Sequence, residues 1–279
     1  MRSVSYPLST YYLTSLEAGV KAVTGRYRRE ALARLINPLS YPRWMEYDLT
    51  INALGPIDGC RVLDVGSPKL PILVLARRSQ CELYSTDIRD YFIEPTANFL
   101  TGMGLGHRIG RDIHLQVADA RDLPYPDAFF DHVFSISVLE HIPDDGDSHA
   151  MRELSRVVRP GGSLTLTVPY TSDGYAEEWV RGDVYERAGD ESAKTFYQRH
   201  YDAAQLNTRL IEPSGLAVKD MTFFGEPRVA FERYWNRIPM MWKLPLLWAQ
   251  PFAASVFLKK LRSDQLGSAC GVAVKLMKN

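Results

Sequence analysis

The chain has 279 residues, of which 46% are apolar and 24% charged, the balance of an ordinary globular protein. Its 33 basic and 33 acidic residues cancel to a formal net charge of zero. Since nucleic-acid-binding proteins usually carry a basic excess, we expect no nucleic-acid partner. The sequence has neither a signal-peptide pattern nor an apolar run long enough to span a membrane, so we expect a cytoplasmic protein.

The N-terminal residues 1–57 precede the regular part of the chain, and we expect them to form a helical lid. Apolar residues at helical spacing predict one helix over residues 15–35 and another over residues 44–54. The first helix also has a basic face, which is either solvated or able to bind an anion. This face consists of Lys21, Arg26, Arg28, Arg29 and Arg34.

Strands and helices alternate from residue 60 onward. Short apolar runs predict strands at 62–65, 81–86, 114–118, 130–137, 163–168, 216–224 and 270–277. Helices are predicted at 70–78 and 148–158, a helix or ordered loop at 92–103, and a further helix after Asp202, which has capping-box spacing. The alternation predicts an open, mostly parallel α/β sheet. Cys60 and Cys81 each precede a strand, which predicts buried free thiols in a reducing compartment.

Three acids, Asp64, Asp87 and Asp119, fall at the carboxyl ends of the first three predicted strands. In open α/β sheets, ligands bind outside these ends, near the point where the strand order reverses. A carboxylate after the second strand can accept both hydroxyl groups of a ribose, and one after the third can accept the exocyclic amine of adenine. Each aspartate alone could cap a helix or turn, but three in register favour a nucleoside site.

Motifs around these acids resemble class I S-adenosylmethionine-dependent methyltransferases, in particular the small-molecule group that includes ubiquinone-biosynthesis enzymes. The resemblance covers about residues 58–170. Its motifs are Val62-Leu-Asp-Val-Gly66, Asp87-Ile88, Asp119-Ala-Arg-Asp-Leu-Pro124, Phe130-Asp-His-Val-Phe-Ser135, Val138-Leu-Glu-His-Ile142 and Arg159-Pro-Gly-Gly162.

The resemblance implies a Rossmann-like methyltransferase domain over residues 58–279. Its sheet would have seven strands in the order 3-2-1-4-5-7-6, with the last strand antiparallel and helices on both faces. S-adenosylmethionine would be the cofactor and S-adenosylhomocysteine the product. The implied contacts are the turn of Asp64, Val65, Gly66 and Ser67 with the methionine part, Asp87 and Ile88 with the ribose, Asp119 and Ala120 with the adenine, and Ser135, Ile136 and Ser137 beneath the sulfonium.

The turn departs from the family pattern Asp-x-Gly-x-Gly-x-Gly, because here it is Asp64-Val-Gly-Ser-Pro-Lys-Leu70. Pro68 removes an N–H donor, whereas Ser67 could donate its hydroxyl and Lys69 could meet the cofactor carboxylate. Either the variant turn still binds the cofactor, or the protein is non-catalytic and kept the fold without it. A nicotinamide-dependent oxidoreductase is disfavoured because no Gly-x-Gly-x-x-Gly follows the strand.

A sulfonium donor is already activated, so catalysis can rest mainly on positioning the acceptor. An acceptor hydroxyl would still benefit from a general base, and His141, just after the fourth strand, is the best candidate by position. A structural role for this histidine is the alternative. The six histidines show no ligand spacing, so we predict a metal-independent enzyme.

The acceptor is expected to be a small or lipid-like molecule, methylated at oxygen or carbon. Residues 170–201 and the insertion 225–268 are candidate acceptor-binding elements. The insertion interleaves tryptophans, phenylalanines and lysines, a composition that suits a peripheral membrane contact, a substrate lid or a dimer contact. The sequence identifies neither the acceptor nor the oligomeric state.

Overall fold

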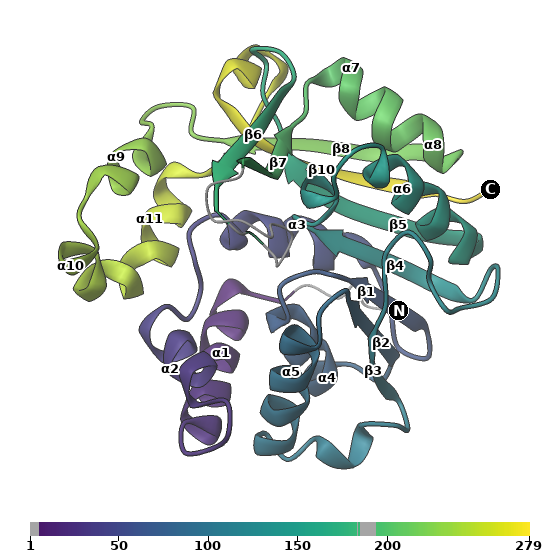
Figure 1. The fold of residues 1–279 in the computed structure, drawn as a ribbon, viewed down its shortest axis with the longest axis vertical. Helices are drawn as coiled ribbons and strands as arrows, with labels where there is room; N and C mark the ends of the chain where they lie inside the picture. Colours follow the sequence, from purple (N-terminus) through teal and green to yellow (C-terminus); the bar gives the residue numbers. More distant parts are fainter. Residues whose placement is uncertain (1–5, 183, 185–193) are drawn as a thin grey trace.

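The computed structural model describes residues 6–182, 184 and 194–279. Its centre is an eight-stranded sheet in the order β3-β2-β1-β4-β5-β10-β8-β9, with helices on both faces (Figure 1). The strands are β1 (Arg61–Val65), β2 (Glu82–Asp87), β3 (Ile113–Val117), β4 (Phe130–Ile136), β5 (Val158–Pro169), β8 (Ala217–Gly225), β9 (Lys259–Lys260) and β10 (Ala269–Met277).

The predicted strand order is confirmed, since β8 and β10 are the sixth and seventh predicted strands. Strands β1 to β5 pair in parallel, whereas β10 is antiparallel to both β5 and β8. The one difference is β9, a two-residue edge strand that the insertion adds beside β8. The prediction therefore missed one short strand of this sheet but had its topology right.

Alternation along the strands builds a separate apolar core on each face of the sheet. Val62 packs in the core beneath α4 (Leu70–Arg78) and α5 (Asp90–Gly102), whereas Leu63 and Val65 pack in the core that contains residues of α6 (Gly146–Val157). The predicted helices 70–78 and 148–158 are thus present, and residues 90–102 form a helix rather than an ordered loop.

The chain leaves β1 through Gly66, which has a φ of 67°. A Cβ at this position would lie 2.7 Å from Cγ1 of Val138, so the turn requires glycine both for its backbone conformation and for its close packing. Pro71 follows in the first turn of α4, where its missing N–H costs nothing.

The single helix predicted over residues 15–35 is wrong. The segment forms two helices, α1 (Leu8–Ala22) and α2 (Arg28–Ile36), which fold back on each other around Gly25. Gly19 permits this close approach, because a Cβ there would lie 2.8 Å from the Leu35 side chain. The apolar spacing of the segment therefore reflects packing between two helices. The second predicted helix is confirmed as α3 (Arg43–Leu54).

Residues 170–201 contain a two-stranded sheet that the sequence did not predict, β6 (Ala176–Arg181) paired antiparallel with β7 (Lys194–His200). Residues 183 and 185–193 of this connection lie outside the described residues. A helical segment follows as α7 (Ala203–Gln205), the π-helical η3 (Leu206–Ile211) and α8 (Glu212–Ser214). The predicted cap is confirmed, because the Asp202 side chain accepts a hydrogen bond from the Gln205 backbone N–H.

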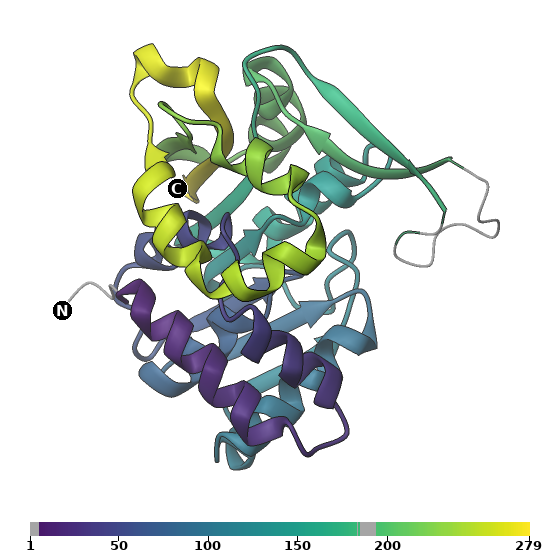
Figure 2. The same ribbon diagram turned by 90° about the vertical axis from the view of Figure 1, so that its left-hand side faces the viewer.

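The insertion consists of short helices that lie against the N-terminal helices (Figures 1 and 2). The Trp248 and Tyr12 rings meet edge-on at 6.1 Å, and Gln250 accepts a hydrogen bond from the Tyr41 N–H at 2.9 Å. No helix in the described residues is long and apolar enough to cross a bilayer. The elements are α9 (Phe231–Arg237), α10 (Met240–Lys243), η4 (Leu244–Ala249), α11 (Gln250–Phe257) and η5 (Ser263–Ser268).

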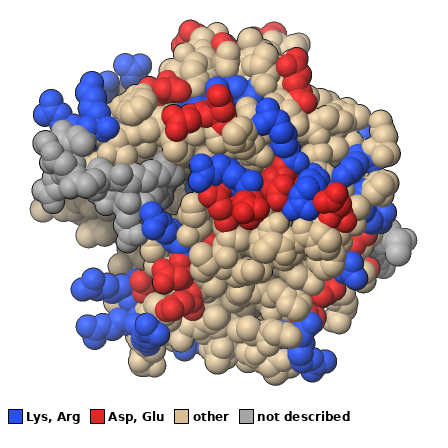
Figure 3. Space-filling view, turned by 45° about the vertical axis from the view of Figure 1, so that its right-hand side comes forward, with Lys and Arg blue, Asp and Glu red and all other residues tan. Residues whose placement is uncertain are grey.

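Two surface properties complete the fold. The three cysteines are free, but only Cys81 is buried, while Cys60 is partly exposed and Cys270 exposed, so the predicted burial of Cys60 is wrong. On the face that Figure 3 shows, basic and acidic side chains lie side by side without a continuous patch of either sign. This agrees with the net charge of zero, and this face offers no basic surface for nucleic acid.

Candidate functional site

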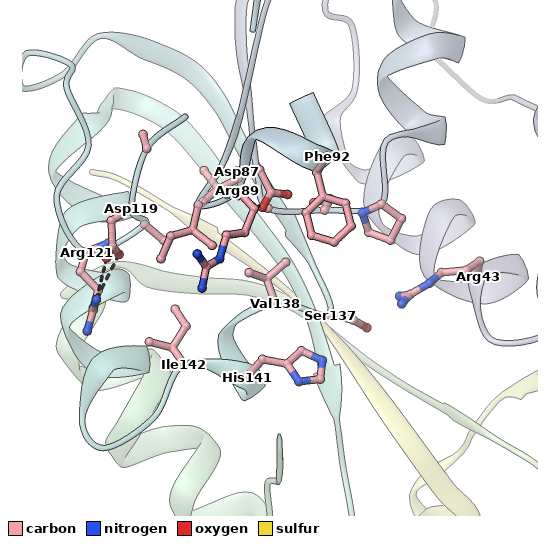
Figure 4. Close-up of a pocket in the computed structure, with 17 residues that line it drawn as sticks. Arg43, Asp87, Arg89, Phe92, Asp119, Arg121, Ser137, Val138, His141 and Ile142 are labelled. Carbon is pink, nitrogen blue, oxygen red and sulfur yellow. Dashed lines mark hydrogen bonds and ion pairs between the residues drawn. The ribbon is translucent and has the colours of Figure 1, made fainter. Parts of the chain in front are cut away.

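A cavity of about 350 Å³ lies at the carboxyl ends of the central strands (Figure 4). The strand order reverses between β1 and β4, and this is where ligands bind in open α/β sheets. Among the predicted cofactor-binding and catalytic residues, the cavity is lined by Val65, Gly66, Ser67, Asp87, Ile88, Asp119, Ala120, Ser137 and His141. The fold therefore brings together residues that are up to 76 positions apart in the chain, from Val65 to His141.

The other three predicted residues, Asp64, Ser135 and Ile136, lie beneath the turn rather than on the cavity wall. Ser135 Oγ donates a hydrogen bond to the Val65 carbonyl at 3.0 Å, and the Ile136 N–H donates to Ser67 Oγ at 2.8 Å. The carboxylate of Asp64 is fully buried. These residues hold the β1–α4 turn in shape from below.

The hypothesis that the charge of Lys69 meets the cofactor carboxylate is wrong. The Lys69 side chain is 5% exposed and points into the protein, with Nζ 3.0 Å from Oδ2 of Asp64 and 3.4 Å from Oδ2 of Asp87. Nζ also donates to the Thr86 carbonyl at 3.0 Å. The lysine thus stabilises two neighbouring buried carboxylates from within the turn.

The two aspartates on the cavity wall differ in their surroundings. Burial, the largest cause, raises the pKa of Asp87, and Lys69 partly opposes this shift. Arg121 lowers the pKa of Asp119, because its guanidinium donates to both carboxylate oxygens, at 2.6 Å to Oδ2 and 3.0 Å to Oδ1 (Figure 4). Asp119 is therefore paired with an exposed arginine, whereas Asp87 is buried and lies beside the buried Lys69.

Arg43 enters the cavity from α3, at the end opposite Asp119 (Figure 4). It pairs with Glu46 on the same helix, and Glu46 also accepts a hydrogen bond from Ser137. Ser137 itself has a φ of 50°, a strained conformation of the kind that clusters at functional sites.

Glu140 is a buried acid near this end of the cavity. Burial and the nearby Glu46 carboxylate raise the pKa of Glu140 to about 8.

Arg43 lines the cavity and Glu46 pairs with it, and neither was among the predicted site residues. The other lining residues that were not predicted are Pro68, Arg89, Phe92, Ala118, Arg121, Val138 and Ile142. Most of these residues are next to predicted residues in the sequence, so the same motifs could have been used to find them. Arg43 directly precedes the predicted helix 44–54 of the expected N-terminal lid, and this position was the only signal for it.

His141 lies at the end of the short helix η2 (Leu139–His141), on the cavity wall. Its Nδ1 is 2.8 Å from the carbonyl oxygen of Tyr197 on β7. Because a carbonyl can only accept, Nδ1 carries the hydrogen, and in the neutral ring Nε2 holds the lone pair. The unpredicted strand β7 thus fixes the tautomer of the predicted base.

The structure shows no candidate metal centre in its described ranges. Within residues 6–182, 184 and 194–279, no group of three or more His, Cys, Asp or Glu side chains could hold a metal ion.

Residues 63–166 match a family described as "Methyltransferase domain". The chain is 34% identical over 128 residues to the methyltransferase GfsG of Streptomyces halstedii, which covers 44% of each chain. It is 26% identical over 140 residues to the sterol 24-C-methyltransferase erg6 of Aspergillus fumigatus, which covers 50% of this chain and 33% of that protein. The matches therefore span less than half the length of these relatives.

The solved structure of geranyl diphosphate C-methyltransferase from Streptomyces coelicolor superposes with a TM-score of 0.58 at 9% identity, covering 92% of this chain and 85% of that one. At this identity the likeness shows the fold alone. The domain match, the relatives and the strand order together identify a class I S-adenosylmethionine-dependent methyltransferase domain in this chain, with the match over residues 63–166.

Proposed function

We propose that this protein transfers a methyl group from S-adenosylmethionine to a small-molecule or lipid-like acceptor, at oxygen or carbon. The observation that carries the proposal is the cavity at the β1–β4 switch point, which Gly66, Asp87 and Ser137 line together. The family to which this domain belongs uses this cofactor. Since the matched region is shorter than the relatives, the activity of the whole chain rests on this argument.

The polar and charged groups along the cavity fit the cofactor. Asp87, an acid at the end of β2, suits the two ribose hydroxyls, and the backbone at Asp119 and Ala120 suits the adenine. Arg43 at the opposite end supplies a cation for the methionine carboxylate, in place of the buried Lys69. Ser137 lies between these ends, near the expected position of the sulfonium.

The bound cofactor would supply an activated methyl group, so the protein has to position the acceptor and, for a hydroxyl acceptor, remove a proton. His141 suits this second role, because its Nδ1–H is held by the Tyr197 carbonyl and its Nε2 can accept a proton. We also assign the exclusion of water from the cavity to the N-terminal residues 1–57, acting as a lid, of which residues 1–5 lie outside the described part of the chain.

The acceptor class follows from the surface of the insertion and from the names of relatives. Met241, Trp242 and Phe252 are 71%, 67% and 74% exposed, an unusual density of large apolar side chains on one insertion. A sterol methyltransferase is among the relatives, and a geranyl diphosphate methyltransferase shares the fold. These observations favour a lipid-like acceptor and a peripheral membrane contact through residues 225–268.

The decisive experiment is a calorimetric titration of S-adenosylmethionine and S-adenosylhomocysteine into the purified protein. Micromolar binding is expected for the wild type and for Asp122→Ala, an exposed acid off the cavity wall, with a loss of roughly tenfold or more in Asp87→Ala. No heat from either ligand would mean that the protein kept the fold but lost the cofactor, the alternative that Pro68 and Leu70 favour by replacing family glycines.

A further inference from the structure

A second cavity, of about 550 Å³, lies between α2, α3 and the first turns of α4 and α5. It shares Arg43, Pro68 and Phe92 with the cofactor cavity, so the two cavities adjoin. Its walls are mainly apolar and aromatic. The residues that give it this character are Leu39, Tyr47, Leu70, Tyr91, Phe92 and Phe99.

Two cations line this second cavity and not the cofactor cavity: Lys69, which is paired with Asp64 and Asp87, and Arg34. The guanidinium carbon of Arg34 lies 4.6 Å from the centre of the Phe99 ring, which holds the group in place by a cation–π contact. Burial lowers the pKa of Arg34 to about 10, so the side chain remains charged at neutral pH. No carboxylate of the described residues lies within ion-pair distance of it.

Two other basic residues of the N-terminal segment have acidic partners. Lys21 pairs with Glu17 at 2.7 Å, and Arg26 lies 3.6 Å from Glu94. Glu30 also lines the second cavity, one helical turn before Arg34, but it is exposed and forms no ion pair with that arginine. A partly buried guanidinium without a counter-charge is costly, and a bound anion would offset this cost.

We propose that the second cavity binds the acceptor of the methyl transfer, and that Arg34 binds a carboxylate or phosphate group on that acceptor. This inference rests on the proposed function. Arg43 and Lys69 are paired with carboxylates, which leaves Arg34 as the cation of this cavity for a ligand. Aromatic walls beside such a cation suit a molecule with an apolar body and a single anionic group, and the volume is that of a site for such a ligand. The shared wall at Phe92 and Pro68 places its apolar body next to the cofactor cavity.

The cofactor's own carboxylate is the other anion that could reach this region. Arg43, which lines both cavities, is placed to bind it, whereas Arg34 does not line the cofactor cavity. The acceptor is therefore the better ligand for Arg34. The basic face of the N-terminal segment is thus divided between solvated residues and one anion-binding arginine.

The test is a calorimetric titration of decyl phosphate, decanol and inorganic phosphate, without cofactor, into the wild type and three variants. Arg34→Gln removes the charge, Arg34→Lys keeps it, and Arg29→Gln changes an exposed arginine of the same helix that does not line the cavity. We expect decyl phosphate to bind the wild type more tightly than either other probe. Its affinity should fall roughly tenfold or more in Arg34→Gln, less in Arg34→Lys, and stay unchanged in Arg29→Gln.

Unchanged decyl phosphate affinity in Arg34→Gln overturns the inference, as does inorganic phosphate binding as tightly as decyl phosphate, which would leave a simple anion site. A parallel titration of S-adenosylhomocysteine should give the same affinity for Arg34→Gln and the wild type. A matching loss there would assign Arg34 to the cofactor carboxylate and overturn the inference too. If the wild type fails to bind S-adenosylhomocysteine, the proposed function fails. The probe titrations contain no cofactor, so they give a separate result for the second cavity.

Discussion

Nζ of Lys69 lies 3.0 Å from Oδ2 of Asp64, and both side chains are buried. This ion pair stands inside the turn where the family pattern has glycines. A glycine-rich turn relies on backbone freedom, whereas here Pro68 restricts the backbone and the lysine ties the turn to the strand ends of β1 and β2. The turn has therefore kept its position by a different set of interactions.

The pair predicts that Lys69→Met destabilises the fold. The substitution would leave the carboxylates of Asp64 and Asp87 buried without a cation, which costs about 3–5 kcal/mol in comparable cases. Lys21→Met, which breaks an exposed helix pair with Glu17, should cost less than about 1 kcal/mol. Urea denaturation of both variants measures the difference, and equal losses would refute the structural role of Lys69.

Gly66→Ala should destabilise the protein for two separable reasons. The φ of 67° costs an alanine about 1–2 kcal/mol, and the new Cβ would lie 2.7 Å from Val138 Cγ1. Gly104→Ala is the matched control, because Gly104 has a φ of 81° but nothing within 4 Å of its Cβ position. In denaturant melts, Gly66→Ala should lose more stability than Gly104→Ala, and adding Val138→Ala should recover the excess. Equal losses without recovery would contradict the close packing.

These positions also mark what sequence could predict. The apolar runs and turns located the strands: β1 is buried on both faces and is followed by Gly66, and β2 ends at Asp87. The order of the strands came from the resemblance to class I methyltransferases, and the structure confirms it. The side-chain direction of Lys69 could not be read in the same way. Whether a turn lysine points to a ligand or back to two aspartates depends on contacts between residues 64, 69 and 87 that only the folded chain defines.

The missed elements have physical reasons of their own. Strand β6 is exposed at nearly every position, so it has no alternation of apolar and polar residues to detect. Helices α1 and α2 pack on each other with a shared apolar surface, and a helical pattern carries across the turn at Gly25. Arg34 was recognised as basic, but its separation from its acidic neighbours appears only in three dimensions.

Asp87→Asn should separate stability from function. Burial raises the pKa of Asp87 in the folded state, so its contribution to stability is present below the unfolded pKa and is lost as pH rises through the folded pKa. Asparagine does not ionise, so the variant does not lose stability in this way as the pH rises. It should be no less stable than the wild type at neutral pH, but it should lose affinity for S-adenosylhomocysteine. Its stability relative to the wild type should increase as the pH rises above about 4, the pKa of an unfolded aspartate.

Urea melts across this pH range and a calorimetric titration check both parts of the Asp87 prediction. Asp122→Asn, a change at an exposed acid, should alter neither quantity. A variant that is less stable than the wild type at neutral pH would mean that the contact with Lys69 outweighs the burial of Asp87. Unchanged binding would remove Asp87 from the cofactor site.

His141→Ala should reduce turnover of a hydroxyl acceptor by about 10²–10⁴-fold, the usual contribution of a positioned general base. Binding of S-adenosylhomocysteine should stay near the wild-type value, since the assigned role concerns the acceptor proton. His149→Ala, an exposed change on α6, is the control. If His141→Ala instead lowers the melting temperature and leaves turnover intact, the bond to Tyr197 is structural.

The insertion should bind anionic membrane surfaces. Trp242 and Phe252 expose most of their side chains, and Lys243, Lys259 and Lys260 place cations on the same insertion. Aromatic rings bind the interfacial region of a bilayer, and nearby lysines are attracted to anionic head groups. In co-sedimentation with phosphatidylglycerol-containing vesicles, the Trp242→Ala, Phe252→Ala double variant should therefore bind roughly tenfold or more weakly than the wild type.

The other uses of this surface give different results in the same set of variants. Trp179→Ala removes a tryptophan that is 52% exposed on β6, outside the insertion, and should leave vesicle binding unchanged. A dimer contact would instead appear as a change of sedimentation coefficient in the double variant without vesicles. A substrate lid would leave both measurements unchanged and lower turnover alone. Because each role buries the same rings against a different partner, only the membrane contact requires vesicle binding that weakens with added salt.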